Sequence, residues 1–340
     1  MEIKEINDKE KWDGYLVGFD DYTFLQSWNW REINGNEREK VFRLGVFEGE
    51  KILGVVQAFT ISAKRGKMLF VPHGPLFYKN DFGVYKEVVD YLKKIAGDNN
   101  CVSLRISPWL QRNEENEGLY KKLGFRKAGV IMHAEDTWLV DLSGSEEEVM
   151  ARMRKTTRNL IRRGIKDGVK IRQSGEIKDM DYLYDLQLEV VKRNNFVPFS
   201  KKYLQREISQ FCQDKSGILF LGESNGEILA AALIVFMGKF AFYYQSGSKE
   251  SRVPVNYVLQ WEVIREAKRR GCTVYNMWGV APEDEPNHPW RGLTIFKTGF
   301  GGELKKYMKT RDLVIAPKYW LAYLIERIPK TWRTIFQLKL

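Results

Sequence analysis

Cysteine and histidine are both scarce in this sequence. The 340 residues include three cysteines and three histidines, scattered along the chain and without a CxxC pair. This distribution argues against a disulfide framework and predicts a reducing compartment, the cytoplasm. It also argues against a His/Cys metal cluster, so we expect neither a metal nor another cofactor.

Long hydrophobic runs are absent as well. The longest, Ile228–Met237, is half as long as a bilayer span and is more typical of a buried strand. The first residues, Met1–Asp8, are largely charged and predict no secretory signal. These features indicate a cytoplasmic protein, which at most lies peripherally on the inner face of the membrane.

What the chain does have is apolar surface and positive charge. Hydrophobic residues make up 44% and aromatic residues 13% of the sequence, enough for a sizeable core, and the length fits two domains. The 55 Lys and Arg residues exceed the 44 Asp and Glu residues, and the net charge is +11. Such an excess favours an anionic partner, either nucleic acid, a phosphorylated substrate or an acidic membrane surface, without distinguishing among them.

The first half of the chain alternates strand and helix patterns. Val41–Phe47 and Lys51–Ser62 are β-rich runs joined by a Gly-containing turn, which predicts a hairpin. Phe82–Gly97 has helical spacing of its apolar residues, and Val102–Ile106 is typical of a strand. This order predicts a mixed α/β fold.

The same landmarks return in the second half in the same order. The matching pairs are the hairpins Leu44–Gly54 and Leu221–Ala230, the helices Phe82–Gly97 and Val255–Arg270, the strand starts Cys101–Leu104 and Cys272–Tyr275, and the turns Lys122–Phe125 and Lys297–Phe300. Two unrelated α/β halves are the alternative to an internal repeat. We favour the repeat, and expect residues 41–125 and 218–300 to superpose as two copies of one fold.

One of these turns is similar to a feature of the GNAT acyltransferase fold. Tyr120–Phe125 looks like the turn near the end of that fold. A GNAT enzyme that uses coenzyme A needs a Gly-rich turn before its central helix, where backbone N–H groups meet the pyrophosphate. The equivalent stretches here, Val71–Pro75 and Gln245–Lys249, lack paired glycines, so an acyl-CoA donor is not supported.

The predicted fold class is therefore α/β, with mixed sheets in two tandem GNAT-like domains. We expect the first domain to span residues 1–144 and the second to span residues 145–312. The aromatic and basic tail, residues 313–340, is expected to pack back on the first domain, with partial membrane contact.

Several motifs resemble those of the FemABX family of Fem-type peptidyltransferases. They cover nearly the whole chain: Phe24–Trp30, Val71–Pro75, Met153–Arg163, Asp167–Val169 and Gly292–Gly302. No heptad stretch is present, so the chain is similar to the compact form of the family, which lacks the coiled-coil arm.

The resemblance implies an enzyme, an aminoacyltransferase of cell-wall biogenesis that contributes to cell shape. We expect it to be a monomer. The donor would be aminoacyl-tRNA, and the acceptor the stem peptide of a peptidoglycan precursor, either UDP-MurNAc-pentapeptide or lipid II. Two alternatives remain open: a GNAT-like N-acyltransferase that uses acyl-CoA on another amine, and a non-catalytic tRNA- or membrane-binding module.

The resemblance also implies roles for particular residues. Lys297 would be catalytic, an exposed cleft lysine that stabilises the oxyanion or the terminal phosphate of tRNA. Phe296 would line the pocket of the 3′-terminal nucleotide. Phe199 and Ser107 replace an Arg and an acidic residue that compact family members can carry, which leaves the general base unidentified.

Two larger sets complete the implied site. The substrate-binding candidates are Trp28, Trp30, Arg105, Lys201, Tyr203, Tyr244, Gln245, Asn276 and Trp278. The tRNA-binding candidates lie on a basic helix that Ser145 and Glu148 would cap at its start: Arg154, Lys155, Arg158, Arg162 and Arg163. A solvated helix face is the alternative explanation for the basic set.

Overall fold

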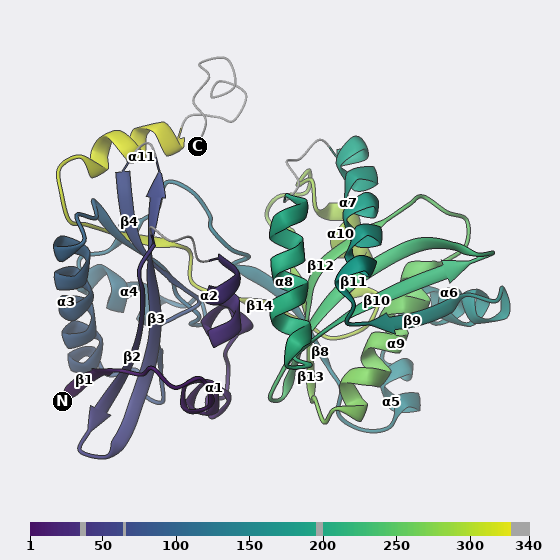
Figure 1. Cartoon of the computed structure of the whole chain (residues 1–340), viewed down its shortest axis with the longest axis horizontal. Coiled ribbons are helices and arrows are strands. Elements are labelled where there is room, and N and C mark those ends of the chain that lie inside the picture. The colour runs from purple at the N-terminus through teal and green to yellow at the C-terminus, as the bar shows by residue number, and fades with distance from the viewer. Residues whose placement is uncertain (35–38, 64–65, 195–199, 328–340) are drawn as a thin grey trace. The chain divides into compact units, whose positions relative to one another are not determined.

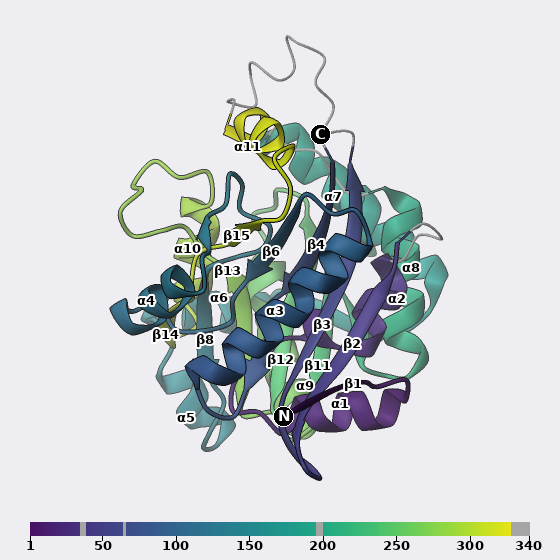
Figure 2. The ribbon, with the colours of Figure 1, turned by 90° about the vertical axis from the view of Figure 1, so that its left-hand side faces the viewer.

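A computed structural model describes residues 1–34, 39–63, 66–194 and 200–327. The chain forms two compact units. The first contains Met1–Glu135 together with the described residues from Lys306 onward, and the second contains Asp136–Lys305 (Figures 1 and 2). Each unit is built on one mixed sheet.

The first unit has a sheet with strand order β1-β2-β3-β4-β6-β15-β7, to which β5 adds by pairing with β3. Its strands are β1 (Glu2–Glu5), β2 (Val41–Glu48), β3 (Lys51–Ala63), β4 (Gly66–Pro72), β5 (Leu76–Phe77), β6 (Ser103–Ser107), β7 (Arg126–Lys127) and β15 (Arg311–Val314). Its helices are α1 (Lys9–Val17), η1 (Phe24–Gln26), α2 (Trp28–Asn34), α3 (Phe82–Asp98), α4 (Glu114–Lys122) and α11 (Tyr319–Arg327).

The second unit has a sheet with strand order β14-β8-β13-β12-β11-β10-β9. Its strands are β8 (Asp136–Asp141), β9 (Lys170–Ser174), β10 (Gly217–Ser224), β11 (Glu227–Met237), β12 (Phe240–Ser248), β13 (Val274–Gly279) and β14 (Glu303–Lys306). Its helices are α5 (Glu146–Ala151), α6 (Lys155–Lys166), η2 (Ile177–Asp179), α7 (Met180–Asn194), α8 (Lys201–Gln213), α9 (Val255–Arg269) and α10 (Arg291–Thr298).

The internal repeat predicted from the sequence is present in the strand pairing. In the first unit β2, β3 and β4 pair antiparallel, and β4 pairs parallel with β6 across the crossover helix α3. In the second unit β10, β11 and β12 pair antiparallel, and β12 pairs parallel with β13 across α9. The two copies therefore share one topology, which confirms the predicted fold class of two tandem GNAT-like sheets.

Each copy is completed by a strand from the other half of the chain. β8 follows the first copy in sequence, yet it lies between β13 and β14 in the second sheet. β15 follows the second copy, yet it lies between β6 and β7 in the first sheet. This exchange moves both unit boundaries to earlier positions in the chain than the expected ones after residues 144 and 312.

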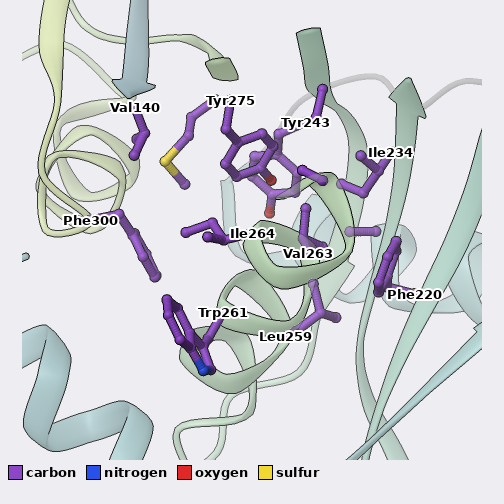
Figure 3. Packing of buried hydrophobic residues seen from close by; sticks show 14 of the residues in the cluster. Val140, Phe220, Ile234, Tyr243, Leu259, Trp261, Val263, Ile264, Tyr275 and Phe300 are labelled. Carbon is purple, nitrogen blue, oxygen red and sulfur yellow. The ribbon is translucent and has the colours of Figure 1, made fainter. Parts of the chain in front are cut away.

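The second unit buries a core on each face of its sheet. Successive residues of a strand point to opposite faces, so Phe220 and Ile234 pack toward α9 (Figure 3). Their neighbours Leu219 and Leu233 pack toward α7 and α8. Helices therefore cover both faces of this sheet (Figure 1), and their buried side chains fix the strands that carry the candidate site.

In the first unit the same alternation separates α3 from the N-terminal helices. Val56 and Ala58 face α3. Between them, the side chain of Gln57 points to the other face, where its Nε2 donates to the carbonyl oxygen of Ser27 at 3.1 Å. Gln26 and its neighbours in η1 are buried, so this part of the N-terminal motif packs against the sheet.

The basic segment forms two helices where the sequence suggested one. Ser145 and Glu148 make the predicted capping box, but the helix that they begin, α5, ends at Ala151. The basic helix α6 begins at Lys155, with Arg154 at its N-cap position. Among the described residues, no helix is long and apolar enough to cross a bilayer.

Candidate active site

Two strands of the second unit separate in the middle of the sheet. β12 and β13 pair only from Phe240 to Phe242 and from Val274 to Asn276. Beyond that point each strand has an irregularity in its pairing with its other neighbour: Tyr244 is an extra residue against β11, and Met277 and Trp278 together face one residue of β8. In the first unit β4 and β6 stay paired as far as Pro72 and Ser107. The splay, typical of a GNAT-type cleft, therefore belongs to the second unit.

The β-bulge at Tyr244 places two consecutive side chains on one face of the sheet. In a regular strand Tyr244 and Gln245 would point to opposite faces, and a bulge removes that alternation. Both side chains contact Glu207 of α8: Tyr244 Oη donates to one carboxyl oxygen, and Gln245 Nε2 lies 3.2 Å from the other. Tyr203, one turn before Glu207, has its hydroxyl 3.4 Å from that of Tyr244.

Glu207 is fully buried beneath these groups. Burial disfavours its charged form and raises the pKa of the carboxyl to about 7, although hydrogen bonds from Tyr244, Tyr203 and Gln245 oppose the shift. Gln245 is held in turn by Gln187 of α7, whose Nε2 lies 3.1 Å from Gln245 Oε1. The network therefore joins two helices to the bulged strand at the splay.

The raised pKa of Glu207 predicts a pH-dependent stability. Because its pKa rises from 4.5 to about 7 on folding, Glu207 contributes stability that is fully present below pH 4.5 and is lost as the pH rises through about 7. Glu207→Gln should remove roughly 3 kcal/mol of this dependence. The measurement is urea unfolding from pH 5 to pH 8, with exposed Glu48→Gln as the matched control. Equal pH dependence in wild type and Glu207→Gln would contradict a carboxyl that titrates in this range.

Trp278 lies on the opposite side of the splay with a left-handed backbone. Its φ is 64°, a conformation that is costly for a bulky residue. Asn276 Oδ1 accepts a hydrogen bond from Trp278 N at 2.8 Å and so holds the turn. The indole contacts Tyr244 edge-on, with ring centroids 6.5 Å apart. The structure therefore brings together five of the substrate-binding candidates: Asn276, Trp278, Tyr244, Gln245 and Tyr203.

Lys297 reaches the same strand end from α10. Its Nζ donates to the carbonyl oxygen of Gly279 at 2.7 Å, next to Trp278 in the chain, and lies 5.6 Å from the centre of the Tyr243 ring. An ammonium group has three N–H donors, and no carboxylate of the described chain pairs with this one. Burial alone lowers the pKa of Lys297 to about 7.

The burial of Lys297 corrects one expectation. Its side chain is not an exposed cleft lysine, because only 4% of the residue is accessible. Phe296 packs edge-on against Tyr257 and Phe300, with ring centroids 5.1 and 5.3 Å away. The apolar side chains of Trp290 and Ile295 on the same helical segment are exposed.

A basic surface lies on α6 and beside it. Four residues of the implied tRNA-binding set are exposed: Arg154, Lys155, Arg162 and Arg163. The fifth, Arg158, is half-buried. Arg163 Nη2 donates to the carbonyl oxygen of Arg252 at 2.8 Å. Arg252 lines an open cavity of about 570 Å³ together with Arg193, Lys249, Glu250 and Ser251. The helix and the cavity therefore adjoin.

Four candidates have partners outside the network of Glu207. Trp28 stacks under the Arg43 guanidinium at 3.5 Å, and Trp30 is buried against Phe59, both in the first unit. Arg105 is also buried there, and its donors are taken by acidic residues. Lys201, the first residue of α8, pairs with Asp181 at 2.9 Å. Phe199 lies outside the described residues.

Glu207 was not recognised from the sequence. It interrupts the apolar stripe of α8, whose other buried members are Leu204, Ile208 and Phe211. A carboxyl at a position of helical apolar periodicity predicts a buried polar network, and this signal could have identified it.

Strand order, the bulge and the splay assign this protein to the class of tandem GNAT-like folds. Solved structures share the fold. FemX superposes with a TM-score of 0.84 at 16% identity, covering 96% of this chain and 100% of that one. A tandem GNAT protein from the clavulanic acid biosynthesis pathway has a TM-score of 0.56 at 11% identity, covering 93% and 99%.

The FemAB family model matches residues 8–222 and 220–327, and the chain belongs to the FemAB family. It is 20% identical over 404 aligned positions to a lipid II:glycine glycyltransferase of Staphylococcus epidermidis, covering 96% of each chain. A protein of the same name from Staphylococcus haemolyticus is also 20% identical, covering 94% of this chain and 95% of that one. The protein is an acyltransferase of the peptidyltransferase type.

Proposed function

We propose that this protein transfers an amino acid from aminoacyl-tRNA to the stem peptide of a peptidoglycan precursor, in the formation of a cell-wall cross-bridge. The observation that carries the proposal is the buried Lys297 ammonium at the end of the splayed strand β13. Gly279 accepts one of its hydrogen bonds and two donors are left over for a substrate. Its low-dielectric surroundings strengthen the attraction for a negative charge.

The reaction requires such a cation at one moment. The acceptor amine attacks the ester carbonyl, the carbonyl oxygen becomes an oxyanion, and the 3′-oxygen of the tRNA leaves as the amide forms. One proton passes from the amine to the departing oxygen. Lys297 would donate hydrogen bonds to the oxyanion or to the neighbouring phosphate, which lowers the barrier of this step. Since the aminoacyl ester already carries the activation energy, the transfer itself consumes no nucleotide.

The basic surface of the second unit supports a tRNA donor. α6 and the adjoining cavity together present Lys155, Arg162, Arg163, Arg193 and Arg252. Lys and Arg side chains bind the phosphates of nucleic acids independently of the nucleotide sequence.

A coenzyme A donor is less compatible with the loop between β12 and α9. Two of its backbone N–H groups, those of Lys249 and Val253, are already bonded within the protein, and Pro254 has none. A pyrophosphate would need such groups unpaired.

Binding of tRNA should therefore depend steeply on salt. If about four phosphates are neutralised, raising the salt from about 50 to about 200 mM should weaken binding by about 10². Replacing Lys155 and Arg162 with Gln should flatten this slope, whereas the same change at Lys86 and Lys94 of α3 should not. Filter binding at a series of salt concentrations measures both. Salt-independent binding, or coenzyme A affinity without tRNA affinity, would contradict the proposal.

For the acceptor, the relatives named for lipid II and glycine favour a glycyl donor and a lipid-linked precursor. The direct test is incubation with glycyl-tRNA and either lipid II or UDP-MurNAc-pentapeptide, followed by mass spectrometry. A mass gain of one glycine residue on either acceptor supports transfer and identifies the acceptor. No gain from any charged tRNA pool, with an active tRNA preparation, would reject the function.

A further inference from the structure

The last described helix presents its apolar side chains to solvent. Trp320, Leu321 and Leu324 of α11 are exposed to 46%, 57% and 63%. Their spacing places them on one face of the helix, called here the α11 face. Isolated exposed leucines are ordinary, but an exposed cluster with an aromatic residue marks an interaction surface.

The opposite face of α11 is fixed to the first unit by buried polar contacts. Glu326 Oε2 accepts a hydrogen bond from Arg105 Nη2 at 2.7 Å, and Tyr319 Oη donates to Asp312 Oδ2 at 3.0 Å. Glu326 is the only acidic residue of the helix, and it points inward. The α11 face is therefore held in place and carries no negative charge from its own helix.

Cations surround the α11 face. The Arg126 guanidinium lies 4.4 Å from the centre of the Trp320 ring, and that of Arg327 lies 5.7 Å from the centre of the Tyr323 ring. Lys127 and Lys318 are exposed next to Arg126 and to the start of the helix. An apolar strip with a basic border matches an interface between acyl chains and anionic headgroups.

An adjacent loop extends the apolar surface. Gly129 lies so close to α11 that a Cβ there would come within 2.9 Å of Glu326 Cβ. Two residues later Ile131 is exposed to 66%. The loop and the helix therefore present apolar side chains from neighbouring parts of the same unit.

We propose that the α11 face docks the protein on the anionic surface of a phospholipid bilayer. Tryptophan is a preferred residue at the membrane interface, and the flanking cations favour negatively charged lipid. A second copy of the chain would have to bring like-charged borders together, so a lipid surface fits better. The purpose of docking, access to a lipid-linked acceptor, rests on the proposed function, whereas binding itself does not.

The test is co-sedimentation of the full chain with vesicles. We expect binding to vesicles of phosphatidylcholine with phosphatidylglycerol, and much weaker binding to phosphatidylcholine alone. Replacing both Leu321 and Leu324 with Gln should lower the partition coefficient by about tenfold or more, because apolar area leaves the interface. The matched control replaces Phe82 and Tyr91 of α3, exposed to 45% and 39% in the same unit, with Gln.

Two results would overturn the proposal: equal vesicle binding by wild type and Leu321→Gln/Leu324→Gln, or a concentration-dependent dimer that only this variant loses while vesicles stay unbound. Transfer to a soluble UDP-linked acceptor separates this proposal from the proposed function. That rate should be the same in wild type and variant. If wild type lacks transfer but binds vesicles through Leu321 and Leu324, the function fails and the docking surface stands.

Discussion

Lys297→Ala is expected to lower kcat for aminoacyl transfer by roughly 10²–10³, a loss of about 2.7–4 kcal/mol of transition-state stabilisation. The reason is that the buried ammonium, which donates to Gly279 O, has donors left for the oxyanion. Lys297→Arg should restore the rate only in part, because a planar guanidinium does not reproduce a compact point charge. Wild-type turnover in Lys297→Ala, measured with glycyl-tRNA and a soluble acceptor, would remove the catalytic role.

The pH dependence of the same rate separates charge from shape. If the ammonium form acts, kcat/KM of the wild type should fall as the pH rises above about 7, where Lys297 loses its proton. In Lys297→Arg this falling limb should disappear, since guanidinium stays protonated. An identical limb in both enzymes would assign it to another group.

Stability should respond in the opposite direction to activity. The pKa of Lys297 falls on folding from 10.5 to about 7, so its charge destabilises the folded state fully below pH 7, and this penalty is relieved as the pH rises toward 10.5. Lys297→Met keeps the length of the side chain and removes the charge. It should therefore melt no lower than wild type, with any gain largest below pH 7. A large fall in melting temperature would mark Lys297 as structural.

Local sequence patterns made the hairpins and crossover helices predictable. The pairing of strands that are far apart in the sequence was not predictable. The hairpin β10–β11 follows from Asn225-Gly226, which both adopt the positive φ that a tight hairpin turn demands. The crossover helix of each copy follows from its apolar spacing. The exchange of β8 and β15 has no such local pattern in the sequence, because the pairing of strands far apart in the chain depends on how the whole sheet assembles.

The site was predictable where a resemblance identified residues and less so where burial decides their chemistry. Lys297 came from a family motif and Trp278 from its position at the end of a predicted strand, and the structure places both beside the splay. The burial of Lys297 was missed because lysines are mostly exposed. Glu207 was missed because its significance depends on the bulge at Tyr244, which turns two strand residues toward α8.

Arg105 was grouped by resemblance with the substrate-binding residues, and the structure gives it another task. Nε and Nη2 bind Asp312 at 2.7 and 2.8 Å, while Nη1 and Nη2 bind Glu326 at 3.0 and 2.7 Å. All three side chains are at most 3% exposed. The cluster ties β6, β15 and α11 together, so no donor of Arg105 is directed to a substrate.

Arg105→Leu should therefore destabilise the protein by about 3–5 kcal/mol, because it leaves two buried carboxylates without their cation. Arg105→Lys should recover only part of this, since an ammonium cannot form two bidentate pairs. Adding Asp312→Asn and Glu326→Gln to Arg105→Leu should restore much of the stability by removing the uncompensated charges. Urea unfolding measures all three variants. In the fraction of Arg105→Leu that remains folded at low temperature, KM for the acceptor should be unchanged. Wild-type stability combined with a raised KM would return Arg105 to the binding site.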